Sequence, residues 1–287
     1  MAGTHCATLE SRAVIEMTGA EARGFLDNLI TVNMAGVDEN TAGYGALLTP
    51  QGKILFDFFI IAAGDAFLFD CAASQRDEFI KRLTFYKLRA KVEIADRSGE
   101  LCVAALWGDD VPGDAGYADP RTPLAGRRMI TPAEDIASTD AQPASEDAYH
   151  AHRISLGLGD TDADIGSGEM FPHEANFDQF GGVDFAKGCY VGQEVVSRME
   201  HRATARKRLV PILGDGVELT SGASVTGNGK PIGAISSVSA SAGLALLRLD
   251  RAQDCYNGGG ELDTGGATLT LVKPAWARFE LPSKKAA

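Results

Sequence analysis

The chain has 287 residues, of which 45% are hydrophobic and 23% are charged. This composition is typical of globular proteins, and the length favours two or three packed units over a single domain. The formal net charge of −12 argues against nonspecific nucleic-acid binding, which requires a broad basic surface.

Five cysteines are scattered along the chain without a C-x-x-C pair, so their number is odd and no metal-binding or redox pair is evident. The first residues, MAGTHCATLESRAVIEM, show no basic and then apolar leader. No apolar stretch approaches the roughly 18 residues that a membrane span requires. We therefore expect a cytoplasmic protein with free thiols and no membrane partner.

The first part of the chain predicts helices and hairpins. Residues 18–33 are expected to form a helix, because Thr18 and Glu21 match a capping box and apolar residues follow at helical spacing. A second helix is expected from Ser74 to about Lys87. Runs that predict strands lie at 44–49, 53–63, 66–72, 91–95 and 101–107. This order predicts an α+β unit of the ferredoxin-like, split βαβ kind, which we assign to residues 1–98.

The middle of the chain is less regular. Residues 108–147 are rich in proline, acidic and small residues, and we expect mostly loops there with one strand at 126–130. A short helix is expected near 148–158, before a glycine-rich stretch. We assign a second α+β unit to residues 99–204.

From Arg206 onward, short strands alternate with Gly and Asn-Gly turns, which predicts a small β-barrel over residues 205–287. The stretch TGNGKPIG (226–233) lacks the spacing of a phosphate-binding loop. Its Asn228-Gly229 pair is typical of a type I′ hairpin turn instead.

One cysteine stands apart from the others, in the stretch DFAKGCYVGQEVVSRMEHR (184–202). A helix that begins near Tyr190 or the next residue would place the Cys189 thiol at its N-terminus, beside Lys187. The helix N-terminus and the lysine charge both lower a thiol pKa and favour the nucleophilic, metal-binding thiolate. The glycines that would allow close backbone approach and positive φ are Gly188 and Gly192. From the pattern alone, a functional thiol and a structural turn are equally well supported.

Asp57 lies inside the apolar run KILFDFFIIAA. Strand alternation divides this run between two faces, one with Leu55, Asp57 and Phe59 and the other with Ile54, Phe56, Phe58 and Ile60. We interpret Asp57 as a partly buried acid with a raised pKa. An edge-strand acid in contact with water is the open alternative.

The stretch FPHEANFDQFGGVDFAKGCYVGQEVVSR resembles the signature of the YgfZ family, which includes mitochondrial iron–sulfur assembly relatives. The K-G-C-Y-x-G-Q-E motif matches without a substitution at Lys187, Gly188, Cys189, Tyr190, Gly192, Gln193 and Glu194. Upstream, Pro172 to Asn176 match Pro-x-Glu-Ala-Asn. TGAEARGFLDNLITVN and YGALLTPQGKILFD also resemble the folate-binding aminomethyltransferase of the glycine cleavage system, so the resemblance covers nearly the whole chain.

The resemblance implies an α+β fold in which two split βαβ units form a folate-binding core and the β-barrel completes an aminomethyltransferase-like ring. It implies tetrahydrofolate as the ligand, with Tyr44, Asp57 and Asn176 as binding residues and Asp57 facing the reactive nitrogens. This sequence departs from the two families at two positions. Ser155 stands where the transferase has a pocket glutamate, and Ala203 stands where YgfZ proteins usually have glycine.

We therefore expect a tetrahydrofolate-binding protein that supports assembly or repair of iron–sulfur clusters and, through them, tRNA modification. In this hypothesis Cys189 is the catalytic thiol and a transient metal ligand, Lys187 stabilises its thiolate, and Gln193 and Glu194 orient the loop. A cluster normally takes four protein ligands, so any cluster would be shared with an iron–sulfur carrier or client protein.

The alternative is a tetrahydrofolate-dependent aminomethyl or one-carbon transferase in which Asp57 is the catalytic group. The absence of an acid at Ser155 weighs against it. A protein that modifies tRNA by itself is a weaker interpretation, because the net charge disfavours direct RNA contact.

Overall fold

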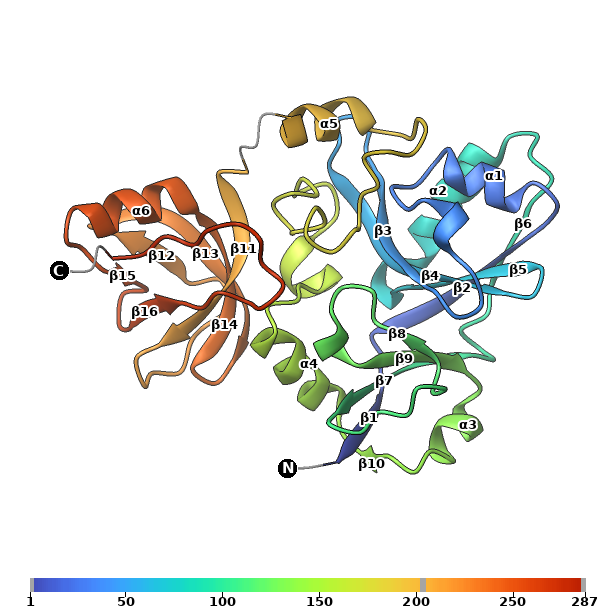
Figure 1. Ribbon diagram of the computed structural model, residues 1–287, viewed down its shortest axis with the longest axis horizontal. Helices are drawn as coiled ribbons and strands as arrows, with labels where there is room; N and C mark the ends of the chain where they lie inside the picture. The colour runs from blue at the N-terminus through green and yellow to red at the C-terminus, as the bar shows by residue number, and fades with distance from the viewer. Residues whose placement is uncertain (1–2, 202–204, 285–287) are drawn as a thin grey trace.

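The computed structural model describes residues 3–201 and 205–284. Two five-stranded sheets and a closed barrel form three lobes, with the barrel on one side and the sheets on the other (Figure 1). The segment 156–192, which contains little regular structure, runs where the three lobes meet.

The first sheet has the strand order β3–β4–β5–β2–β6, and all neighbouring strands are antiparallel. Its strands are β2 (Arg12–Thr18), β3 (Gly43–Leu48), β4 (Ile54–Ala63), β5 (Ala66–Ala72) and β6 (Glu93–Asp96). The helices α1 (Ala22–Asp27) and α2 (Arg76–Lys87) cover one face, where Leu26, Phe79 and Leu83 are buried with Phe58. Two short turns of helix, η1 (Met34–Gly36) and η2 (Ala73–Gln75), lie in the connections.

The second sheet has the order β10–β1–β7–β9–β8, in which only the β1–β10 pair is parallel. Its strands are β1 (Thr4–Thr8), β7 (Cys102–Gly108), β8 (Tyr117–Ala118), β9 (Arg127–Thr131) and β10 (Gln142–Pro143). The helices of this part are η3 (Pro123–Ala125), α3 (Ala133–Ala137), α4 (Glu146–Ser155), η4 (Thr161–Ile165) and α5 (Gln193–His201). The first strand of the chain thus belongs to the second sheet. The unit boundaries after residues 98 and 204 stay predictions, and residue 204 lies outside the described residues.

The C-terminal lobe is a closed barrel with the strand order β11–β14–β13–β12–β15–β16. Its elements are β11 (Lys207–Gly214), β12 (Ser224–Gly227), β13 (Lys230–Ser239), β14 (Ala242–Arg248), α6 (Leu249–Asn257), β15 (Leu262–Asp263) and β16 (Thr268–Leu271). Asn228 and Gly229 both have positive φ, +52° and +71°, as a type I′ turn requires. The predicted α+β fold with a C-terminal barrel and the predicted hairpin turn are confirmed.

The helix predicted for residues 18–33 is wrong over most of its length. Thr18 is the last residue of β2, where it pairs with Glu93 of β6, so it cannot cap a helix. The Glu21 carboxylate accepts a hydrogen bond from the backbone N–H of Lys91 at 2.8 Å instead of closing a capping box. Pairing with a strand distant in the sequence overrides the local signal, and only the six residues of α1 are helical.

Apart from the short η helices, the prediction missed the strands β1, β2, β8, β10 and β15 and the helices α3 and α6. Four of the seven residues of β2 are buried, because the strand pairs with β5 on one side and β6 on the other. Within residues 3–201 and 205–284, no helix is long and apolar enough to cross a membrane.

Candidate functional site

Asp57 lies on the face of β4 that is turned toward the second sheet. Leu47 pairs with Phe56 and Leu48 with Ile54, so a β-bulge leaves Leu55 without a partner. The predicted alternation holds from Phe56 to Ile60. It fails for Ile54 and Leu55, which pack on the faces opposite to those expected, because the extra residue shifts the alternation by one.

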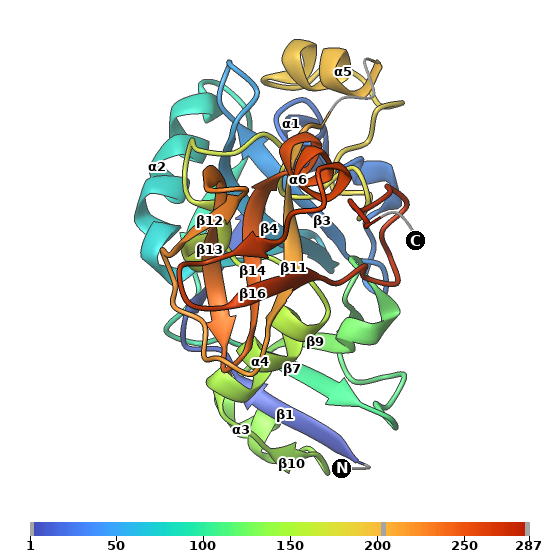
Figure 2. The same ribbon diagram turned by 90° about the vertical axis from the view of Figure 1, so that its left-hand side faces the viewer.

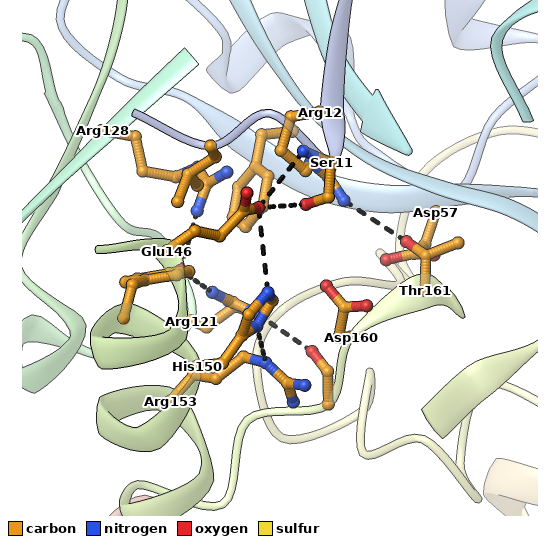
Figure 3. A pocket seen from close by; sticks show the side chains of 14 residues that line it. Ser11, Arg12, Asp57, Arg121, Arg128, Glu146, His150, Arg153, Asp160 and Thr161 are labelled. Carbon is orange, nitrogen blue, oxygen red and sulfur yellow. Dashed lines mark hydrogen bonds and ion pairs between the residues drawn. The ribbon is translucent and has the colours of Figure 1, made fainter. Parts of the chain in front are cut away.

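The Asp57 carboxylate is only 4% exposed and is held by two hydroxyl groups. Thr161 of η4 donates a hydrogen bond to it at 2.7 Å (Figure 3), and the Tyr44 hydroxyl of β3 donates at 3.2 Å. Burial raises the pKa of Asp57, and the nearby Arg12 charge and the two donors only partly oppose this effect. The interpretation of Asp57 as a buried acid is confirmed, and the edge-strand alternative is wrong.

A buried carboxylate beside this acid joins the two sheets. Asp70 of β5 is fully buried and pairs with Arg12 of β2 and with Arg128 of β9, each at 2.6 Å. A second buried pair, Arg121 with Asp119 at 2.7 Å, lies close by. The guanidinium groups of Arg128 and Arg121 sit 4.2 and 4.8 Å from the centre of the Phe59 ring.

These side chains leave little space between them. The cavity beside Asp57 has a volume of about 20 Å³, which is enough for one water molecule. Pockets for small molecules usually enclose roughly 300–1,000 Å³. The cavity is lined by Leu9, Ser11, Arg12, Asp57, Phe59, Arg121, Arg128, Glu146, Tyr149, His150, Arg153, Gly159, Asp160 and Thr161. In this arrangement the residues do not fit tetrahydrofolate, and no chemical step through that cofactor follows from them.

Two residues expected near the ligand lie elsewhere. Asn176 donates from Nδ2 to the carbonyl of Leu209 at 2.8 Å and accepts from Arg208 at 3.1 Å, so it attaches the central segment to the barrel. Ser155 is exposed, and its hydroxyl donates to the carbonyl of His152 at 2.7 Å. Neither residue lines the cavity. Ala203 lies outside the described residues.

Sequence reasoning missed the residues that dominate this cluster: Arg12, Asp70, Arg121, Arg128 and Thr161. Asp70 could have been found, because it interrupts the apolar strand AFLFDCA just as Asp57 interrupts its own strand. Arg12 is far along the chain from Arg121 and Arg128, so the convergence of these arginines has no signal in sequence spacing.

Lys187 anchors the loop that carries Cys189. The Lys187 side chain is 1% exposed, and its ammonium lies 3.3 Å from the Asp27 carboxylate. The same group donates to the backbone carbonyls of Ile30, at 3.0 Å, and Val32. Burial lowers the pKa of Lys187, and the Asp27 charge partly opposes this. The expected pairing of this ammonium with the thiol is not seen, because the charge is used to hold the loop against the end of α1.

The loop backbone is fixed at both ends. Asp184 accepts hydrogen bonds from the backbone N–H groups of Ala186 and Lys187 at 2.7 and 3.0 Å. Gly192 has φ +82°, and a Cβ there would lie 2.5 Å from the carbonyl oxygen of Thr49 in the β3–β4 turn. The expectation for Gly192 is therefore confirmed. It is wrong for Gly188, which has no positive φ and whose Cβ, if it had one, would extend into open space.

Cys189 is exposed, whereas Cys6, Cys71 and Cys255 are buried and Cys102 is partly buried. Burial raises the pKa of Cys71 to about 12. Helix α5 begins at Gln193, four residues beyond the thiol, so Cys189 is not in its first turn as predicted.

The rest of the motif frames this exposed thiol. Tyr190 is buried, and its hydroxyl has no hydrogen-bond partner among the described residues. Burial raises the pKa of Tyr190 to about 12. Gln193 and Glu194 are the first residues of α5, and their side chains form no hydrogen bond within the described part of the chain. No motif residue lines the cavity beside Asp57, so the structure has two separate candidate sites.

Known protein families match two parts of the chain. Residues 8–111 match the GCVT N-terminal domain, and residues 206–279 match the CAF17 C-terminal beta-barrel domain. Glycine cleavage system aminomethyltransferase T from Bartonella henselae has a similar structure, with a TM-score of 0.76, over 98% of this chain and 88% of that one. Its sequence identity of 16% shows a shared fold alone. The predicted aminomethyltransferase-like architecture is confirmed, while the finer resemblance to YgfZ stays a prediction.

Curated relatives are similar over 71% of the chain. The mitochondrial iron-sulfur cluster assembly factor IBA57 homologs of Pyricularia oryzae and Chaetomium globosum are each 34% identical, over 219 and 240 residues. The chain spans only 56% and 55% of the length of these two relatives. Their names place them in mitochondria, and by this comparison the cytoplasmic location expected from the sequence is wrong.

Proposed function

We propose that this chain supports the assembly or repair of iron–sulfur clusters and that the Cys189 thiol is the group that acts. The observation that carries the proposal is the exposure of this one thiol on a loop whose backbone is fixed on both sides. The similarity to proteins named as iron–sulfur cluster assembly factors supports the same role.

The geometry of the loop suits a group that meets another molecule. Lys187 and Asp184 hold the residues before the thiol, and Gly192 after it packs closely against the β3–β4 turn. The thiol would release its proton to solvent and donate sulfur electrons to an iron of the cluster, which is the cargo. Because a cluster takes four ligands and the loop supplies one, the others come from an iron–sulfur carrier or client protein.

Tetrahydrofolate is not part of this proposal. It stays a prediction from resemblance, and the cavity of about 20 Å³ beside Asp57 does not support it. For the same reason we do not propose a one-carbon transferase with Asp57 as the catalytic group. We propose that effects on tRNA modification are indirect, through enzymes that need a cluster.

The test is complementation in a strain that lacks this gene. Wild type, Cys189→Ala, Cys189→Ser and Asp57→Asn would be compared by the activity of a [4Fe–4S] enzyme and by the level of thiomethylated tRNA. We expect both cysteine variants to fail and Asp57→Asn to restore activity in proportion to its folded amount.

Cys102→Ala is the matched control, because that thiol is partly buried and lies outside the motif. Full activity of Cys189→Ala would refute the proposal. Failure of Asp57→Asn at a normal folded level, with Cys189→Ala active, would instead favour a folate enzyme.

A further inference from the structure

The C-terminal end of α2 carries basic and apolar side chains together. We define the α2 surface as Lys81, Arg82, Phe85, Lys87, Leu88, Arg89 and Lys91. Its five basic residues lie between Phe79 and Val92 without an acidic residue, in a chain whose net charge is −12. Figure 2 shows α2 along the outer edge of the molecule.

The apolar residues of this surface are unusually exposed. Leu88 is 88% exposed and Phe85 is 68% exposed, the highest fractions among the large hydrophobic residues in the described part of the chain. Phe79 and Leu83 of the same helix are fully buried in the core. The helix is thus apolar on its inner side, as its packing requires, and also on part of its outer side. Apolar groups gathered on the outside of a protein typically mark an interaction site.

The backbone at Leu88 is also unfavourable for a leucine. Its φ and ψ are +46° and −101°, and it follows the last residue of α2. Helix ends of positive φ favour glycine or asparagine, and a bulky residue there is an outlier. Since Leu88 is almost fully exposed, packing inside this chain does not compensate for the strain. Strain of this kind often accompanies a functional role.

The positive charges are largely uncompensated. Lys81 lies 3.1 Å from Glu78, within α2. Across residues 3–201 and 205–284, the basic residues of this surface that form no ion pair are Arg82, Lys87, Arg89 and Lys91. The nearest acids in sequence, Glu78 and Glu93, flank the surface and do not interrupt it. The Glu21 carboxylate lies at its edge, where it accepts a hydrogen bond from the backbone N–H of Lys91 at 2.8 Å.

We propose that the α2 surface docks an acidic protein partner. Phe85 and Leu88 would enter an apolar recess of that partner, and the surrounding basic residues would pair with its carboxylates. Aromatic and arginine side chains are enriched at the centres of protein interfaces. The proposal does not depend on the role of Cys189.

Two other polyanionic partners fit less well. A nucleic acid would meet a molecule of net charge −12, and of the two exposed apolar side chains only Phe85 has a flat ring on which a base could stack. A membrane surface is bound by the continuous apolar face of an amphipathic helix. That face of α2 is occupied, since Phe79 and Leu83 are in the core.

The test is site-specific photo-crosslinking of the full chain in living cells. Phe85 would be replaced by p-benzoylphenylalanine, and crosslinked products would be identified at peptide level by mass spectrometry. We expect a crosslink to an acidic segment of one protein. Reversing charge with Arg82→Glu and Arg89→Glu, both exposed, should lower its yield by about tenfold or more, because like charges oppose docking.

The matched control is Lys230→Glu with Arg251→Glu, which makes the same change in net charge on the exposed surface of the barrel and should leave the yield unchanged. Unfolding midpoints of all variants would show that folding is intact. A crosslink to RNA or lipid, no crosslink, or a yield equally lowered by both double variants would overturn the proposal.

Discussion

The buried cluster around Asp57 and the loop around Cys189 hold their reactive groups in opposite ways. In the cluster, carboxylates and guanidinium groups are buried and satisfy one another, as Asp70 does with Arg12 and Arg128. In the loop, the backbone and Lys187 are fixed while the thiol is left exposed. The first arrangement serves the joining of the two sheets, and the second leaves a group free to react.

The comparison separates stability from function. Removing one member of a buried charge pair leaves the other unpaired in a medium of low polarity, which is costly. Changing an exposed side chain costs little stability, because water replaces its contacts. Variants in the cluster should therefore lower the free energy of unfolding, and variants of the thiol should lower activity alone.

The largest effect is expected for Asp70→Asn. The change leaves Arg12 and Arg128 without their shared carboxylate, so the free energy of unfolding should fall by about 3–5 kcal/mol. Urea unfolding monitored by circular dichroism measures it. Asp77→Asn is the control, since its pair with Arg76 is exposed and should contribute less than about 1 kcal/mol. Equal effects of the two changes would contradict the structural role of the cluster.

A smaller effect is expected for Gly192→Ala. Its φ of +82° and a Cβ only 2.5 Å from the Thr49 carbonyl oxygen should cost about 1–3 kcal/mol. Gly188→Ala, in open space and without a positive φ, should change stability by less than about 0.5 kcal/mol. Thermal unfolding of the two variants measures this difference in stability. If Gly188→Ala were the more harmful for folding, the described loop conformation would be incorrect.

Asp57→Asn should change how stability depends on pH. Because the folded state raises the pKa of Asp57, it binds the proton more tightly than the unfolded state does. The contribution of Asp57 to the free energy of unfolding is fully present below about pH 3.9 and is lost as the pH rises through the raised pKa. The free energy of unfolding of wild type should therefore exceed that of Asp57→Asn by less as the pH rises over that range. The difference should fall by about 1.4 kcal/mol for each pH unit by which the pKa is raised.

Urea unfolding of both proteins from acid to neutral pH measures this difference, with Asp65→Asn as an exposed control. A constant difference between wild type and Asp57→Asn at all pH values would show that the pKa of Asp57 is not raised.

The smallest effect on stability is expected for Cys189→Ala, less than about 0.5 kcal/mol, because the side chain is exposed. In native protein treated with iodoacetamide, mass spectrometry should find Cys189 modified well before Cys6, Cys71 and Cys255. Equal rates for exposed and buried thiols would mean that the native state opens on the labelling timescale, and the contrast between the two regions would be lost.

The sequence by itself determined the local elements and the exceptional residues. Strand β4, the Asn228-Gly229 turn and the barrel follow from alternation and turn residues, which act over a few positions. Asp57 could be identified as a buried acid, because a carboxylate inside an apolar strand must share the burial of its neighbours. Cys189 could be singled out from its motif.

Only the tertiary structure decided what these residues contact. Thr18 became a strand end because β6, some 75 residues away, pairs with it. Lys187 is adjacent to the thiol in sequence, but its ammonium binds Asp27 and two carbonyls more than 150 residues earlier. The cluster around Asp57 is assembled from β2, β5 and β9, so whether that region is open or filled depends on long-range packing that sequence spacing does not encode.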